Sequence, residues 1–172
     1  RDNINRFVQR MYTEAKRLKP WLRVGISPFG IWRPGNPSGV TGLDAYADLY
    51  ADSRTWLQRG WVDYLAPQLY WAIGSSGQPF NALLDWWLAQ NSAGRHVWPG
   101  LAAYRVADGT TSAFSAAEIA NQVQSVRSRG TSPGIILFRA SLIFVNRDNL
   151  FTTLASSSFA APAVAPAMPW VD

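Results

Sequence analysis

Strand-like and helix-like segments alternate along the sequence at a nearly constant spacing. Four apolar, strand-like segments begin near Val24, Val62, Val97 and Ile135, so the unit recurs every 35 to 38 residues. A segment with helical hydrophobic period follows each of them, and none has the clean polar alternation of a half-exposed strand. Strands that are buried on both faces and separated by helices indicate a parallel sheet covered by helices.

The unit length favours a TIM-type (β/α)8 barrel, in which about 250 residues form eight units of roughly 31 residues each. A doubly wound sheet stays open as the alternative, although such folds usually carry a phosphate-binding loop, and neither GxGxxG nor GxxxxGK[ST] occurs in the sequence. Four units are half of a barrel and would expose two edge strands and an apolar lumen. We therefore expect residues 1–157 to be the C-terminal half of an α/β barrel, with a missing N-terminal half or a second copy as its partner.

Helices are expected at 4–18, 44–59, 80–90, 116–130 and 147–154, and strands at 22–29, 61–71, 96–104 and 134–140. The first helix has no strand before it and is interpreted as the end of a preceding unit. Ser115 and Glu118 have the spacing of a capping box. Residues 158–172 are rich in Ala and Pro, which predicts a linker toward a missing C-terminal domain, or a terminus with no successor.

Composition indicates a globular protein and excludes several kinds of site. The sequence has 48% hydrophobic and 16% charged residues, as globular proteins do. The absence of Cys and the presence of only one His exclude a structural zinc site, and no metal or cofactor is expected. The net charge of +5 comes from 14 Arg and two Lys spread along the chain, with a modest basic cluster in the first helix. A solvated helix face explains this cluster better than phosphates or an anionic cell surface, and no nucleic-acid partner is expected. No apolar run reaches the roughly 20 residues of a transmembrane helix, and any signal peptide lies upstream of Arg1.

Aromatic and hydrogen-bonding residues gather where the predicted strands end, which is the face that carries the active site in parallel barrels. Aromatic rings stack on sugar rings while Gln and Arg bond hydroxyls, so the mixture suits a carbohydrate cleft better than a nucleotide pocket. Simple packing is the alternative, and it is preferred for Trp56, Trp86 and Trp87 on the helices. The candidate substrate-binding residues are Ser27, Phe29, Trp32, Arg33, Gln68, Tyr70, Trp71, Tyr104 and Arg139, with Ser141 added on less support.

A glycosidase normally needs two carboxylates about 5 to 10 Å apart. Most acidic residues here lie on or at the start of predicted helices, among them Glu118, and Asp63 falls at the N-terminal end of its strand. Asp108, in the loop after the third strand, is the one catalytic candidate, although Asp-Gly is also an ordinary turn pair. The catalytic pair is therefore not identified in this chain.

Two long motifs, GISPFGIWRPG at 25–35 and WVDYLAPQLYW at 61–71, carry a resemblance to a known family. Together with RDNINRFV before them and WPGLAAYR after them, they resemble the bacterial glycosyl-hydrolase-like proteins of family ten. The resemblance implies a (β/α)8 barrel that hydrolyses envelope glycans such as peptidoglycan, in an exported or lipid-anchored protein, often with a β-sandwich domain downstream. Family members carry an Asp-Asp-Tyr segment upstream of the RDNINRF helix, and this sequence contains no such segment.

Three functional hypotheses follow. In the first, the chain is part of a glycoside hydrolase and supplies its sugar-contacting rim. In the second, it belongs to a carbohydrate-binding barrel without catalysis. In the third, it is a structural half-barrel whose aromatic residues only pack. For the chain alone, negligible hydrolytic activity is expected, because its carboxylates are badly placed.

Overall fold

The computed structural model describes residues 1–129 and 133–171, and it contains parallel strands in the order in which they occur along the chain. β1 pairs with β2 and β2 with β3, while β4 pairs with β5, all in parallel. Bridges from Gln68 to Phe29 and to Gly100 connect the two groups. The strands are β1 (Gly25–Ile26), β2 (Tyr64–Leu65), β3 (His96–Val97), β4 (Gly100–Leu101) and β5 (Ile136–Leu137).

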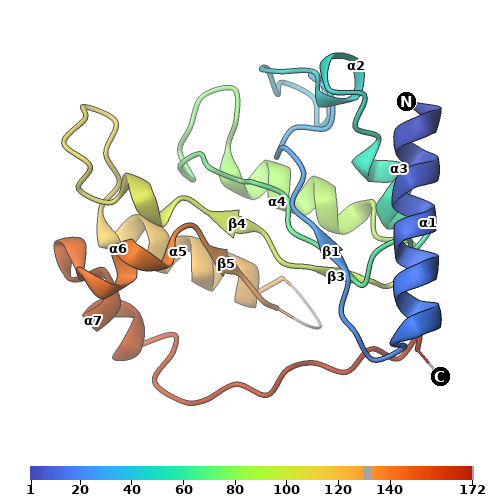
Figure 1. Ribbon diagram of the computed structural model, residues 1–172. Coiled ribbons are helices and arrows are strands. Elements are labelled where there is room, and N and C mark those ends of the chain that lie inside the picture. The colour runs from blue at the N-terminus through green and yellow to red at the C-terminus, as the bar shows by residue number, and fades with distance from the viewer. Residues whose placement is uncertain (130–132, 172) are drawn as a thin grey trace.

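The helices surround one side of this sheet, with α1 at one end and α6 and α7 at the other (Figure 1). An order that follows the chain without reversal is that of a barrel wall, whereas a doubly wound sheet reverses its order at the switch point. The helices are α1 (Asp2–Leu18), α2 (Ala45–Asp48), α3 (Ser53–Gln58), α4 (Phe80–Ala89), α5 (Ala116–Arg127), α6 (Ala140–Phe144) and α7 (Leu150–Ala155), with 3-10 turns η1 (Ala103–Arg105) and η2 (Arg147–Asn149).

The predicted helix at 44–59 is wrong, because the chain forms two short helices there. The Asp44 carboxylate caps α2 by accepting from the Ala47 N–H at 2.9 Å, and the Asp52 carboxylate caps α3 by accepting from the Thr55 N–H at 3.4 Å. Between them Tyr50 has a left-handed φ of 53°, which ends any continuous helix. Two Asp residues that each start a helix explain the break.

Helices expected at 4–18 and 80–90 are confirmed by α1 and α4, and the capping Ser115 is confirmed at the start of α5. The expected last residue of that helix, Gly130, lies outside the described residues. The third strand ends at Leu101 rather than at 104, and the fourth gives way to α6, a helix that the sequence reading missed.

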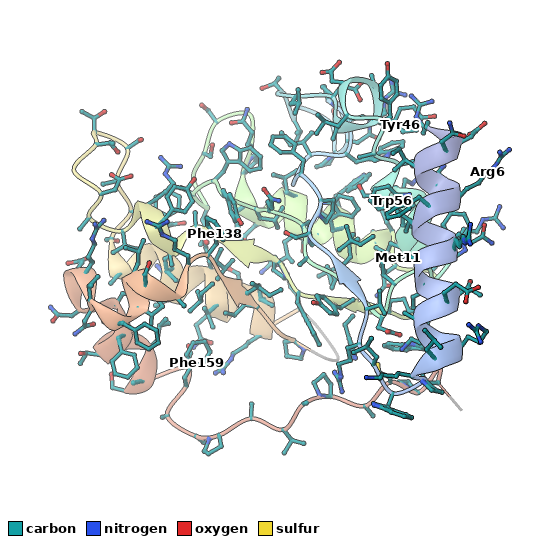
Figure 2. All side chains as sticks on the ribbon, viewed as in Figure 1. Arg6, Met11, Tyr46, Trp56, Phe138 and Phe159 are labelled. Carbon is teal, nitrogen blue, oxygen red and sulfur yellow. The ribbon has the colours of Figure 1, made fainter. Side chains whose placement is uncertain are left out.

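The outer face of the sheet packs on the helices and forms the core. Trp87, fully buried on α4, donates from Nε1 to the Gly30 carbonyl at 2.8 Å, so the helix is fixed to the end of the first strand. Burial of Trp56 and Trp87 confirms their predicted packing role, and Figure 2 shows Trp56 beside α1. The core includes Leu57, Leu65, Leu69, Phe80, Leu83, Leu84, Val97, Leu101, Ile119 and Val123.

The inner face of the sheet carries a stack of aromatic rings near the start of the strands. Trp98 stacks on Tyr64 at 4.8 Å and on His96 at 4.9 Å between ring centroids. Glycines leave room for these rings, because a Cβ on Gly25 would lie 2.1 Å from the Tyr64 ring and one on Gly134 would lie 2.6 Å from the Trp98 ring. The interior is thus filled by side chains, as in small parallel barrels.

Apolar side chains stay exposed at both ends of the sheet. On α1, Val8 is buried but Ile4 and Phe7 are exposed, so the predicted apolar stripe of this helix is only partly covered by the chain. At the other end, Ile136 and Phe144 are exposed. Within residues 1–129 and 133–171, no helix has the length and apolar character needed to cross a membrane.

Residues 160–171, here called the C-terminal strap, have no helix or strand but bind back onto the start of the strands. Arg23 donates to the Pro166 carbonyl, and His96 Nε2 lies 3.1 Å from the Ala167 carbonyl. Trp170 donates from Nε1 to the buried Asp63 carboxylate at 2.8 Å. Figure 1 shows the strap running along the side of the sheet opposite the long loops and ending next to α1.

Candidate functional site

The strands end along one edge of the sheet, where β3 and β4 count as one segment of the chain. The loops at 30–43, 72–79 and 106–114 extend from this edge (Figure 1). This edge is called the rim. Because the first turn of each helix that follows a strand faces the same edge, the rim collects residues from strand ends, loops and helix starts.

At the first and second strand ends, four of the predicted residues come together. Gln68 Nε2 donates to the Ser27 backbone carbonyl at 3.0 Å, which fixes the amide at the inner side of the sheet. The Phe29 ring meets the edge of Trp71 at 5.7 Å between centroids and at 89° between planes. All but the exposed Ser27 are half-buried, so their polar and aromatic surfaces remain accessible.

A second group, here called the aromatic triad, consists of Tyr70, Tyr104 and Phe138, whose ring centroids all lie 5.9 Å apart. Tyr104 is 36% and Phe138 is 49% exposed, so their rings offer open faces and edges. Burial, and secondarily the neighbouring Tyr104, raises the pKa of the Tyr70 hydroxyl, which therefore stays a neutral hydrogen-bonding group. Figure 2 shows Phe138 at the end of the sheet away from α1.

Phe138 is a rim residue that was not predicted from the sequence, which pointed instead to its neighbour Arg139. A signal was available, since the two-residue period of a strand puts Gly134, Ile136 and Phe138 on the same inner face. The predicted Arg139 follows it, exposed, at the start of α6, with Ser141 in the first turn. Both thus lie at the rim beside the aromatic triad.

Trp32 and Arg33 are not brought into either group. The Trp32 ring stacks on Trp86 at 5.9 Å and its Nε1 donates to Asp52 at 3.2 Å. Arg33 pairs with Asp44 at 3.2 Å and lies 4.8 Å from the centre of the Tyr46 ring. These contacts hold the 30–43 loop against α2 and α3, which is a packing arrangement.

Asp108 is held in a turn. Its Oδ1 accepts from the Thr110 N–H at 2.9 Å and from the Thr110 hydroxyl at 2.7 Å. These two hydrogen bonds lower the pKa of Asp108, whereas a glycosidase acid requires a raised pKa. The geometry therefore fits the turn interpretation of Asp108.

Glu118, which sequence reasoning assigned to a cap, has its carboxylate at the rim instead. Ser115 caps α5, but Glu118 does not complete the capping box, because its Oε1 accepts from the Ile73 N–H and from Gln122 Nε2, both at 2.8 Å. The fully buried Gln122 also donates to the Trp71 carbonyl at 3.1 Å. The signal that could have found Glu118 is its place in the first turn of a helix that follows a strand.

A shallow groove of about 450 Å³ opens between the loop that follows the second strand and the loop that follows the third. Arg105 crosses its floor, donating to the Tyr70 carbonyl at 3.2 Å and to the Ser112 carbonyl at 2.7 Å. The groove, here called the loop groove, is lined by Trp71, Ala72, Gly74, Ser75, Arg105, Ser112, Ala113, Phe114 and Glu118. In the described part of the chain, no three His, Asp or Glu side chains lie close enough together to bind a metal ion.

Residues 1–115, which carry both rim motifs, match the family described as Glycosyl hydrolase-like 10. The chain belongs to this family. The glycosyl hydrolase YngK of Bacillus subtilis is 34% identical over 179 aligned residues, which cover 100% of this chain and 35% of that protein. The glycosyl hydrolase DigH of Escherichia coli is 34% identical over 113 residues, which cover 63% of this chain and 26% of that protein.

The chain thus spans about a third of the length of its YngK relative. Its match to the glycosyl hydrolases of this family therefore extends over only part of their length. Among solved structures, bee venom hyaluronidase in complex with a hyaluronic acid tetramer matches with a TM-score of 0.52 at 18% identity. The match covers 88% of this chain and 49% of that chain, which is a TIM barrel. At this identity the likeness shows the fold, a parallel α/β barrel arrangement, and not the substrate.

Proposed function

We propose that the chain is the C-terminal half of the (β/α)8 barrel of a glycoside hydrolase and supplies the sugar-contacting part of its rim. The observation that carries the proposal is the aromatic triad together with Phe29, Trp71 and Gln68, all at the carboxyl ends of strands in a chain of the Glycosyl hydrolase-like 10 family. Open aromatic faces beside amide and hydroxyl groups are what a pyranose ring needs.

The assignment to the C-terminal half is supported by α1, which packs on α3 and precedes the first strand. The exposed apolar residues at both ends of the sheet suit contact with a further barrel wall, from upstream residues or from a second copy. The main catalytic carboxylates are proposed to come from that wall, because Asp108 is held in a turn. This chain alone would then have negligible activity.

The favoured substrate is a bacterial envelope glycan of the peptidoglycan type, and the favoured location is outside the cytoplasm. Both proposals rest on family membership and on the bacterial origin of the two curated relatives, which are named glycosyl hydrolases.

A carbohydrate-binding barrel without catalysis is the second candidate. The turn geometry of Asp108 favours it, because it leaves the described rim without a pair of free carboxylates at glycosidase spacing. Hydrolysis by the intact protein, measured as reducing ends released from cell-wall glycan, separates the two candidates. Release of reducing ends supports the hydrolase, and binding without release supports the binder.

The rim itself is tested by Phe138→Ala and Tyr104→Ala in the intact protein, with glycan affinity measured by calorimetry. Loss of one stacking ring, worth about 1 kcal/mol, is expected to weaken binding about fivefold. Trp21→Ala is the control, because Trp21 is an exposed aromatic residue at the opposite end of the strands. Equal affinities for all four proteins, or no binding of any glycan, would refute the proposal and leave a purely structural role.

A further inference from the structure

The loop groove adjoins the aromatic triad. The link is Tyr70, whose ring belongs to the triad while its backbone carbonyl accepts from Arg105 on the groove floor. Trp71 lines the groove and also meets Phe29 at the rim. Tyr70 and Trp71 thus connect the two groups of residues, so neighbouring sugars of one glycan chain could contact both.

Glu118 presents a hydrogen-bond acceptor in the groove. Its Oε1 is occupied by the Ile73 N–H and Gln122, and none of the hydrogen bonds among residues 1–129 and 133–171 uses the other oxygen, Oε2. Charge-assisted bonds of 2.8 Å at one oxygen hold the carboxylate in a fixed orientation, so the second oxygen is ready for a ligand. A carboxylate oxygen accepts hydrogen bonds from two sugar hydroxyls without reorganisation.

Arg105, which also lines the groove, presents a fixed positive charge. Two backbone carbonyls and the Phe114 ring, 4.4 Å from the guanidinium carbon, hold it in place. A lining with one anion, one cation, two serines and two aromatic rings favours a neutral ring with many hydroxyls over a phosphate. The groove volume of about 450 Å³ also falls in the range of about 300 to 1,000 Å³ that is usual for small-molecule sites.

We propose that the loop groove is a second sugar subsite, in which Glu118 Oε2 accepts hydrogen bonds from the hydroxyls of a neutral pyranose. This inference rests on the proposed glycan-binding function of the rim and extends it by one binding position. Its occupant is the next sugar of the chain that the aromatic triad binds.

The test is Glu118→Gln in the intact protein, with affinity measured by calorimetry for chitotetraose, a hyaluronic acid tetramer and soluble peptidoglycan strands. The amide oxygen of Gln can still accept from Ile73 and Gln122, so the loop keeps its support, but an NH2 donor replaces the Oε2 acceptor. About a tenfold loss of affinity for the best-bound glycan is expected. Ser112→Trp, which fills the groove from an exposed loop position, is expected to cause a similar loss.

Glu14→Gln is the matched control, because Glu14 is an exposed acid on α1 whose partner is Arg17. Unchanged affinity in both groove variants, with weakened binding in Phe138→Ala, would overturn the subsite and leave the rim function standing. If the wild-type protein binds none of the three glycans, the proposed function fails and the subsite with it.

Discussion

Asp63 is fully buried, yet its carboxylate has four hydrogen-bonding partners among the described residues. Lys16 Nζ lies at 2.5 Å and the Val24 N–H at 2.8 Å from Oδ2, while Tyr12 and Trp170 donate to Oδ1 at 3.0 and 2.8 Å. Burial alone would raise the pKa of Asp63, but the hydrogen bonds, with that from Lys16 the largest, lower it overall. Burial, followed by the charge and the hydrogen bond of Asp63, raises the pKa of Tyr12 to about 12.

Asp63→Asn is expected to destabilise the intact protein by about 3 kcal/mol at pH 7, because it removes one partner of a buried ion pair. A folded-state pKa below the ordinary value of 3.8 gives stability that is complete above pH 3.8 and declines as the pH falls below it. The wild-type advantage, measured by urea unfolding, should therefore be much smaller at pH 2.5 than at pH 7. An advantage that is the same at both pH values would contradict the assignment.

Gly25→Ala is expected to destabilise the protein by about 2 kcal/mol, because overpacking against an aromatic ring forces the backbone apart. The Cβ would lie 2.1 Å from the Tyr64 ring, whereas nothing lies within 4 Å of a Cβ on Gly74, so Gly74→Ala is the control. Thermal unfolding of Gly25→Ala, Tyr64→Ala and the double variant should show coupling between the two sites. Strictly additive losses would exclude the clash as the cause.

At the residue scale, sequence reasoning located the rim but not all of its members. Strand-end position identified Gln68, Tyr70 and Trp71 because neighbours in sequence stay neighbours on a strand. Phe138 and Glu118 had weaker signals, namely the two-residue strand period and a place in the first turn of a helix, and only the packed structure shows both side chains at the rim. Trp32 was indistinguishable from Trp71 in sequence, since each follows a strand, and its contacts with Trp86 and Asp52 separate the two in the structure.

At the scale of elements, the helices with a clear apolar period were predicted well, and among the short ones only α7, expected at 147–154 and observed at Leu150–Ala155, was predicted. α1, α4 and α5 are long enough for the periodicity to be counted, whereas α2, α3 and α6 span six residues or fewer. In the 44–59 segment, two capping Asp residues outweighed the helical pattern between them. The boundary of the domain at 157 and the domain expected beyond it stay predictions.

Tyr50→Gly is expected to stabilise the protein by about 1 kcal/mol, because a left-handed φ costs a residue with a Cβ about that much and costs glycine little. Tyr50 has a φ of 53° and an exposed side chain, so little packing is lost. Leu49→Gly is the control, since exposed Leu49 has a φ of −106° and should lose stability. Equal effects of the two glycines on the urea midpoint would show that strain at Tyr50 does not matter.

For the whole molecule, the regular spacing of the strand-helix units predicted a parallel barrel arrangement. The strand order and the likeness to the hyaluronidase structure support this arrangement. The spacing of the units could not predict that the Ala/Pro-rich C-terminal strap binds to the sheet. Prolines indicate an extended chain, but whether that chain is free depends on Asp63, His96 and Arg23, which come from other segments.

Trp170→Ala is expected to release the C-terminal strap, because the indole fills the site between Asp63 and His96, where it lies 4.9 Å from the His96 ring. Limited proteolysis should cut residues 160–171 about tenfold faster in this variant, as local unfolding becomes easier by roughly 1.4 kcal/mol. Val164→Ala is the control within the strap, since that side chain is 93% exposed. Equal cutting rates in wild type and Trp170→Ala would show that the indole does not anchor the strap.

The strap also determines how the molecule would be oriented when it is attached to a sensor surface. Trp170 is held beneath the starts of the strands, while the aromatic triad and the loop groove lie beyond their ends. A biotin or gold-binding group attached next to Trp170 would therefore hold the molecule by its base. Immobilised on a sensor chip in this way, the chain would present its rim to the flowing solution. Random coupling through lysines would instead use the exposed Lys19, which follows α1, because Lys16 is paired with the buried Asp63.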